Sequence, residues 1–557
     1  MTRVAAFSPG LEQLAGAARA DLAERHAVAR LWERDATLWK REPEHTRIIE
    51  NTLGWLTVAA DLADDLDSLG EFVEEVRADG FTDAVLLGMG GSSLAPEVLS
   101  EVFGTREGYL RLHILDSTDP AAVLGVADRL DLERTLFIVA SKSGGTTETA
   151  CFHSFFYGKL QERCGAHAGQ HFVAITDEDT SLQREAVGQD FRAVFINPSD
   201  IGGRYSALSF FGMVPAALTG LDLQQLLGRV SAMVELCGPD VTVEENPGAS
   251  LAAVISGLAG QGREKLTLVA SPPVASFGAW VEQLVAESTG KEGRGVLPVD
   301  LEPLGPPGAY GDDRLFVYLR LEDGADAARD EAIAALAASG QPVITIPLAS
   351  PWDLGGEFFR WEVATALSGA LLGIDPFDQP NVQESKDNTR RLLDVFTREG
   401  ELPPLEGDAV KVVDLRLRDV LTALLAAARP DDYVSLQAYA TPSAAAWSAL
   451  EEARVAIRTR TRLATTAGYG PRFLHSTGQY HKGGPDRGLF VQLVSNDRGD
   501  ALIPGQFYSF SALKRAQADG DLASLRAHGK RVLRVELGDD PVAGLRAVAA
   551  ALEQGGA

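Results

Sequence analysis

The sequence predicts an α/β fold of two doubly wound parallel-sheet subdomains, with a helical N-terminal segment before them and an α/β extension after them. Three observations predict it. Short apolar runs that favour strands alternate with helical stretches in two successive parts of the chain. Helical apolar spacing precedes the first part, and further strand-like runs follow the second. A chain of 557 residues is also too long for one hydrophobic core.

Composition restricts the partners that this protein can have. The formal net charge is −27 at pH 7, whereas nucleic-acid binding needs basic clusters, so we expect no nucleic-acid partner. No uncharged apolar run approaches the length of a membrane span, which predicts no membrane partner. Three scattered cysteines without CxxC spacing, and an N-terminus too short in apolar length for a signal peptide, predict a cytoplasmic location.

The helical N-terminal segment is predicted over residues 1–75. Apolar residues recur with helical spacing from about residue 11 to residue 66, among many Ala, Glu and Arg residues. Trp32, Trp39 and Trp55 are expected to anchor these helices on the body of the protein. The segment carries no catalytic signal.

The first α/β subdomain is predicted over residues 76–245. A strand is expected within residues 82–88, and four further strands at 110–115, 136–140, 171–175 and 193–196. Helical stretches separate them, which predicts a parallel sheet with helices on both faces. Ligands of such sheets bind at the carboxyl ends of the strands, where the loops 88–93 and 141–149 are expected to face one pocket.

These two loops differ in the chemistry that they offer. Gly88, Gly90 and Gly91 allow a close approach of backbone to a ligand, but they serve equally well in a tight structural turn. Between Ser141 and Thr149 the chain offers five hydroxyls, two glycines and one lysine ahead of a helix that Thr146 or Thr147 can cap. Because a helix N-terminus attracts anions, this second loop suits a phosphate monoester; an ordinary polar turn is the alternative interpretation.

Arg204 is the third candidate in this subdomain. It follows two glycines and precedes an apolar helix at residues 210–218. That placement can aim a fixed guanidinium at an anion, although a surface salt bridge would use the same residue.

The second α/β subdomain is predicted over residues 246–400, with strands at 266–270, 315–319 and 343–346. A helix predicted at residues 274–284 leads to Glu287 and to a glycine-rich turn. A glutamate at the end of a helix is more often a solvated residue than a catalytic one.

A proline-bounded turn at residues 375–380 follows an apolar helix predicted at residues 361–372. The next helix is expected to begin near residue 382, with Asn381 or Asp378 as its cap. A capped helix start is the structural interpretation of this stretch.

The C-terminal α/β region is predicted over residues 401–557, after a linker at residues 401–406, with strands at 433–438, 489–493 and 532–537. Residues 468–485 are dense in Gly, His, Gln and Lys, as expected of a loop that lines an active site. His475 and His481 have no Cys partner and no third ligand at metal spacing, so a zinc site is not expected.

Taken together, six of these stretches resemble the motifs of phosphoglucose isomerase. The resemblance covers about residues 81–386 and is closest to the isomerase half of bacterial transaldolase–phosphoglucose isomerase fusions. It implies that the two subdomains are of the sugar-isomerase (SIS-like) type. The motifs are Gly88-Met-Gly-Gly-Ser-Ser, Ser141-Lys-Ser-Gly-Gly-Thr-Thr-Glu-Thr, Gly202-Gly-Arg-Tyr-Ser, Glu287-Ser-Thr-Gly-Lys, Phe377-Asp-Gln-Pro and His475-Ser-Thr-Gly-Gln-Tyr.

The resemblance implies reversible isomerisation of glucose 6-phosphate and fructose 6-phosphate through an enediolate, in glycolysis and gluconeogenesis, without a cofactor or a metal. By the same resemblance, Glu287 matches the base, Arg204 the group that stabilises the enediolate, and His475 with Lys386 the ring-opening pair. Gln379 matches a sugar contact. The phosphate-binding positions are Gly91, Ser92, Ser141, Lys142, Ser143, Thr146 and Thr149.

The order of the motifs departs from the ordinary family pattern, in which the histidine motif lies between the glutamate and Phe-Asp-Gln motifs. Here His475 follows both of them. In ordinary members the partner subunit supplies this histidine, so the resemblance leaves open a homodimer and whether His475 acts in its own chain. Relatives of the fused type share the altered order.

Three alternatives remain. A broader isomerase would also accept mannose 6-phosphate, and a non-catalytic sugar-phosphate-binding protein of the same fold could dispense with Glu287, Arg204 and His475, all of which are present. A dinucleotide-binding dehydrogenase would need a third fingerprint glycine, which does not follow Gly88 and Gly90 at the required spacing. Transaldolase activity is not expected, because no region for an eightfold barrel remains.

Overall fold

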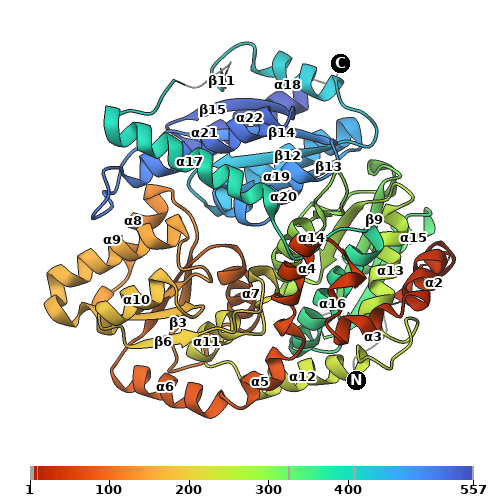
Figure 1. Ribbon diagram of the computed structural model, residues 1–557. Helices are drawn as coiled ribbons and strands as arrows, with labels where there is room; N and C mark the ends of the chain where they lie inside the picture. Colours follow the sequence, from red (N-terminus) through yellow and green to blue (C-terminus); the bar gives the residue numbers. More distant parts are fainter. Residues whose placement is uncertain (1–5, 9, 324–325, 405–408, 555–557) are drawn as a thin grey trace.

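Three five-stranded sheets organise the computed structural model, which describes residues 6–8, 10–323, 326–404 and 409–554. Figure 1 shows the C-terminal sheet and its helices, in blue, lying across the two earlier α/β units. The signal-peptide expectation and the predicted linker fall partly on residues outside the described ranges. No helix in the described part of the chain is long and apolar enough to cross a membrane.

The first sheet is entirely parallel, in the order β3-β2-β4-β5-β6. Every residue of β2 and β4 is buried, because helices cover both faces of such a sheet. All five strands predicted in this part of the chain are present, with ends shifted by no more than one residue. They are β2 (Asp83–Gly88), β3 (Arg111–Leu115), β4 (Thr135–Ala140), β5 (Phe172–Thr176) and β6 (Ala193–Ile196).

The second sheet has the order β1-β10-β9-β7-β8 and is parallel except for β1, which runs antiparallel to β10. The three strands predicted in this subdomain are parallel to one another, and the antiparallel edge strand β1 was not predicted. Strands β1 and β8 are too short to give an apolar pattern, and β1 comes from the segment expected to be only helical. The strands are β1 (Ala6–Phe7), β7 (Lys265–Ala270), β8 (Leu297–Val299), β9 (Arg314–Leu321) and β10 (Val343–Leu348).

The third sheet is parallel, in the order β11-β15-β14-β12-β13. The sequence did not predict β11 or β13, because small residues and threonines replace the usual apolar run in β13. The loop after β13 carries His475. The strands are β11 (Ala409–Lys411), β12 (Tyr433–Tyr439), β13 (Ala464–Tyr469), β14 (Gly488–Ser495) and β15 (Arg531–Gly538).

Helices cover the three sheets and join them. Those before the first sheet are α1 (Leu11–Leu14), α2 (Gly16–Glu24), α3 (Ala27–Trp32), α4 (Pro43–Glu50), α5 (Val58–Ala63) and α6 (Leu66–Ala78). Those of the first unit are α7 (Leu94–Phe103), α8 (Pro120–Arg129), α9 (Thr147–Cys164), α10 (Ser181–Gly188), α11 (Phe210–Leu218) and α12 (Leu223–Leu236). The second unit has α13 (Pro247–Ala259), α14 (Phe277–Thr289), α15 (Ala327–Ala338), α16 (Leu354–Leu372) and α17 (Pro380–Glu399). The third has α18 (Leu417–Ala426), α19 (Ala444–Thr461), α20 (Gly478–Gly483), α21 (Phe510–Ala527) and α22 (Pro541–Gln554).

The N-terminal helices share one hydrophobic core with the first two units. Trp55 is fully buried and stacks on Tyr205, with ring centroids 5.3 Å apart, and Trp39 meets Phe377 edge to face at 5.2 Å. Tyr205 adjoins Arg204, so the contact of Trp55 with Tyr205 links the N-terminal segment to the predicted site. The division of the chain at residues 75, 245 and 400 stays a prediction.

Candidate active site

Arg204 is the most constrained side chain of the predicted site. It is 3% exposed and lies in a short 3₁₀ turn, Gly203–Tyr205. Its Nε donates to Ser288 Oγ at 2.7 Å, and one terminal nitrogen donates to the carbonyl oxygens of Pro376 at 2.6 Å and Asp378 at 3.0 Å. The other terminal nitrogen donates to Gln379 Oε1 at 3.0 Å. These hydrogen bonds fix the guanidinium in place.

Glu287, the predicted base, meets this guanidinium. It lies in the last turn of α14, and its Oε1 is 3.4 Å from Nη1 of Arg204. Its Oε2 accepts a hydrogen bond from Gln283 Nε2 at 3.1 Å, one turn earlier in the same helix. Gln283 Nε2 also donates to the carbonyl oxygen of His475 at 2.7 Å, which connects the base to the histidine loop. Sequence analysis missed Gln283, although its spacing from Glu287 places both on one helix face.

His475 pairs with a carboxylate that sequence analysis did not select. Its Nε2 lies 3.0 Å from Glu148 Oε1, in the first turn of α9. Burial opposes ionisation of Glu148, but the charge and hydrogen bond of His475 outweigh it and hold the pKa of Glu148 below its usual value. The carboxylate therefore stays ionised and orients the ring. The sequence feature that could have identified Glu148 is its position as an acidic residue inside the hydroxyl-rich motif at residues 141–149.

Lys386 stands beside this pair. It is exposed on α17 and lines a cavity of about 350 Å³ together with Glu148 and His475. Gln379 immediately precedes α17, two helical turns before Lys386. The predicted cap of this helix is wrong: the N-cap residue is Gln379, and the side chain of neither Asn381 nor Asp378 caps it.

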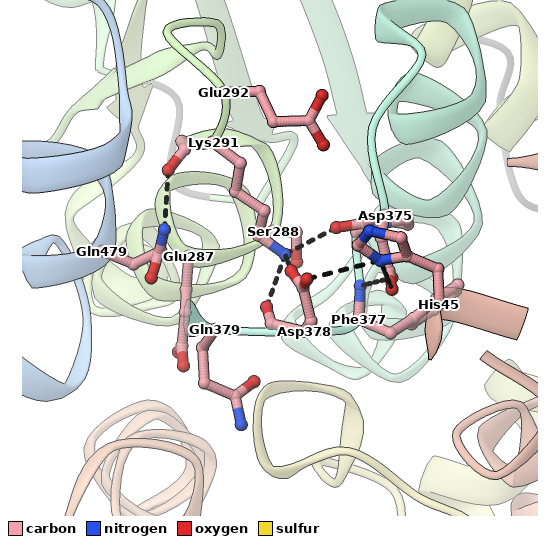
Figure 2. Close-up of polar contacts among 12 residues, drawn as sticks. His45, Glu287, Ser288, Lys291, Glu292, Asp375, Phe377, Asp378, Gln379 and Gln479 are labelled. Atoms are coloured by element: carbon pink, nitrogen blue, oxygen red, sulfur yellow. Dashed lines mark hydrogen bonds and ion pairs between the residues drawn. The ribbon is translucent and has the colours of Figure 1, made fainter. Parts of the chain in front are cut away.

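A buried lysine fixes the loop that carries Gln379, as Figure 2 shows. Lys291 Nζ donates to the carbonyl oxygen of Asp375 at 2.6 Å and pairs with Asp378 Oδ1 at 2.7 Å. Burial and the nearby charge of Arg204 lower the pKa of Lys291 to about 8, against the attraction of Asp378. His45, from α4, lies 3.0 Å from Asp375 Oδ2. An N-terminal helix therefore also holds this loop.

His45, Asp375 and Asp378 are the one group of described residues whose ligand atoms lie close enough to share a metal ion. The Lys291 ammonium already supplies a positive charge at Asp378. This arrangement makes the group a structural ion-pair network rather than a metal centre.

The hydroxyl-rich loop is only partly arranged as the sequence predicts. Ser141 Oγ lies 3.0 Å from Thr146 Oγ1, and Ser143 is exposed. Thr146 is the N-cap residue of α9, but its side chain makes no capping hydrogen bond. Thr149 is 2% exposed, and its Oγ1 has no hydrogen-bond partner among the described residues. The hydrogen-bonding capacity of this buried hydroxyl is therefore unused within the described chain.

Lys142 points away from these hydroxyls. Its Nζ pairs with Asp177 and donates to the carbonyl oxygen of Ser199 at 2.8 Å. Two of the three N–H donors of the ammonium are therefore already engaged.

Close glycine contacts bring the first strand-end loop to the same place. A Cβ on Gly91 would lie 2.0 Å from the carbonyl oxygen of Gly203, and Gly90 (φ +55°) leaves no room for one beside Gln283 and His475. Ser92 adjoins them and is partly exposed. These glycines allow loops of the chain itself to meet, which is the structural alternative that the sequence left open.

The parallel α/β units and this set of hydroxyl, carboxylate, guanidinium and imidazole groups are those of a sugar-phosphate isomerase. The family model described as phosphoglucose isomerase matches residues 23–294. Glucose-6-phosphate isomerase of Rubrobacter xylanophilus is 32% identical over 58% of this chain and 84% of its own length. The enzyme of that name from Thermus thermophilus is 30% identical over 61% of this chain and 90% of its own length. The chain belongs to the phosphoglucose isomerase family.

Two solved structures resemble this one. A hypothetical protein from Thermus thermophilus has a TM-score of 0.59 at 26% identity, covering 70% of this chain and 99% of its own. Glucose-6-phosphate isomerase from Chlamydia trachomatis has a TM-score of 0.54 at 20% identity, covering 74% of this chain and 88% of its own, and shares the fold. The predicted α/β fold class is confirmed. The particular resemblance to transaldolase fusions stays a prediction.

Proposed function

We propose that this protein is an aldose–ketose isomerase that interconverts glucose 6-phosphate and fructose 6-phosphate, a reaction of glycolysis and gluconeogenesis. The observation that carries the proposal is the 3.4 Å contact between Glu287 and Arg204, which puts a base beside a fixed cation. Proton transfer next to a carbonyl needs both groups, because the enediolate that forms carries a negative charge.

The phosphate is held at the N-terminus of α9. Thr149 supplies a free buried hydroxyl, and Ser141, Ser143 and Thr146 lie at the same helix start. The unpaired N–H groups of the helix start favour an anion there. Gly91 and Ser92 would complete this contact from the neighbouring loop. In this proposal Lys142 acts through the loop backbone, because Asp177 and Ser199 hold its side chain.

Ring opening falls to His475 and Lys386, which line one cavity. Because the ionised Glu148 accepts a hydrogen bond from the N–H at His475 Nε2, Nδ1 is the ring nitrogen left to exchange a proton with the substrate. As the C1–O5 bond of the aldose breaks, His475 Nδ1 takes the proton of the C1 hydroxyl and Lys386 gives a proton to the ring oxygen. The imidazolium and the neutral amine then exchange one proton through water, which restores both groups.

Isomerisation then moves two protons, one between carbon atoms and one between oxygen atoms. Glu287 takes the proton of C2 of the open aldose, and the electron pair moves to the carbonyl oxygen to form an enediolate that Arg204 stabilises. The hydroxyl proton passes from O2 to O1, and the protonated Glu287 returns its proton to C1, which yields the ketose. Gln379, fixed on Arg204, contacts the sugar. Atoms and charges balance without any further reactant.

The test couples fructose 6-phosphate turnover by the purified protein to glucose-6-phosphate dehydrogenase. We expect wild-type activity and a loss of at least about 100-fold in kcat for Glu287→Gln, which keeps the shape but removes the base. An inactive wild-type protein, or an unchanged kcat in Glu287→Gln, would reject the assignment. Cytoplasmic location and homodimerisation stay predictions. Localisation imaging would test the first, and light scattering would test the second.

A further inference from the structure

Helix α21 of the C-terminal unit brings a buried glutamine to the carboxylate that pairs with His475. Gln517 is 3% exposed, and its Nε2 donates to Glu148 Oε1 at 2.7 Å. Behind it, the fully buried Thr118 donates from its hydroxyl to Gln517 Oε1, also at 2.7 Å. Thr118 follows β3 in the first unit. Four side chains, two from the first unit and two from the third, therefore form one line.

Only one arrangement of protons satisfies this line. An ionised Glu148 carboxylate accepts hydrogen bonds and donates none, so both His475 Nε2 and Gln517 Nε2 must present N–H groups to it. The amide oxygen of Gln517 then faces Thr118, whose hydroxyl must donate. Each group therefore fixes the orientation of the next, from Thr118 to the imidazole.

A second contact holds α21 in this register. Lys514, one turn before Gln517, pairs with Asp119 at 2.9 Å, and both side chains are buried. Asp119 adjoins Thr118 and caps α8. Thr118 and Asp119 are neighbours in the first unit, and they bond to Gln517 and Lys514 on one face of α21. These two contacts fix the position of the Gln517 amide.

We infer that Gln517 and Thr118 are positioning residues for ring opening, acting on His475 through Glu148. The inference rests on the proposed function and gives the C-terminal unit a second role besides carrying His475. With the Gln517 donor removed, Glu148 is free to turn in the cavity, and the imidazole loses its fixed orientation. The phosphate hydroxyls, Glu287 and Arg204 have no part in this line.

The experiment compares the isosteric variants Thr118→Val and Gln517→Met with the conservative variant Thr118→Ser. Fructose 6-phosphate tests the whole reaction. The analogue 5-deoxyfructose 6-phosphate lacks the ring oxygen and needs no ring opening; NMR follows its deuterium incorporation at C1 in D₂O. We expect kcat on fructose 6-phosphate to fall about tenfold in the first two variants, the effect of about 1.4 kcal/mol. KM, and the rate on the analogue, should change less than about twofold.

Thr118→Ser keeps the hydroxyl and should restore most of the activity, and Gln224→Met, on the exposed surface of α12, should match the wild type. Equal losses on both substrates, or no recovery with serine, would mean that the line is only structural and would overturn the inference. Wild-type rates in both isosteric variants would overturn it as well. An inactive wild type would instead reject the proposed isomerase function.

Discussion

Glu148 and His475 are separated by 327 positions in the chain, and their side chains meet at 3.0 Å. The carboxylate stands at the start of α9 in the first unit, and the imidazole follows β13 in the third. The histidine that we propose for ring opening is therefore oriented by the same helix start that we propose as the phosphate site. In this proposal one short motif serves both ends of the substrate, and α9 couples substrate binding to ring opening.

The free hydroxyl of Thr149 gives a prediction about binding. Thr149→Val keeps the volume and removes the hydroxyl, and a hydrogen bond to a charged group contributes about 1.5–3 kcal/mol. We expect KM for fructose 6-phosphate to rise about tenfold or more with kcat nearly unchanged, because the phosphate is bound equally in the ground and transition states. Steady-state kinetics measure this. Thr149→Ser is the control, and an unchanged KM would place the phosphate elsewhere.

Lys291 gives a prediction about stability. Lys291→Met removes the cation of a buried pair and leaves Asp378 without its partner, which should cost about 3 kcal/mol in the free energy of unfolding. Urea denaturation measures this cost. The double variant Lys291→Met/Asp378→Asn should recover part of it, because no unpaired charge then remains. If the double variant loses the sum of both single effects, the pair does not interact.

The arrangement of the site within a single chain predicts the outcome of a mixing experiment. Glu287→Gln and His475→Ala each disable one function, and here both residues are joined through Gln283 in the same molecule. We expect no recovery of activity when the two variants are unfolded together and refolded as a mixture. Recovery towards one quarter of the wild-type rate would show that chains exchange His475 across an interface.

Two half-buried carboxyls behind the His475 loop predict how stability depends on pH. Glu282 and Asp300 line a cavity of about 370 Å³ with Arg472. Burial and the charge of Asp300 raise the pKa of Glu282 to about 8, and burial raises the pKa of Asp300 to about 7 against the attraction of Arg454.

In the unfolded chain both groups titrate near about pH 4. From there to about pH 8 the folded state holds protons that the unfolded state has lost, so the free energy of unfolding falls as pH rises, by up to about 1.4 kcal/mol per pH unit for each proton. Glu282→Gln and Asp300→Asn should flatten this fall in urea titrations between about pH 5 and about pH 8. Slopes equal to that of the wild type would contradict these pKa values.

Local sequence predicted most of the fold. Apolar, β-branched runs such as residues 135–140 give strands wherever they occur, and helical spacing between such runs requires parallel crossovers. Short edge strands escaped prediction because two or three residues carry no pattern. Strand β1 was missed for this reason, and its antiparallel pairing depends on where the N-terminal segment crosses the second sheet.

The sequence by itself determined the candidate residues: the hydroxyl-rich helix start, and Arg204, Glu287, Lys386 and His475 as members of family motifs. Only the tertiary structure decided how they act together, with Glu148 on the imidazole and Lys142 turned to Asp177. The physical reason is the distance along the chain over which each preference or contact is set. Strand and helix preferences depend on neighbours along the chain, whereas the pairing of a buried charge depends on which side chains the packed units bring within about 3 Å of it.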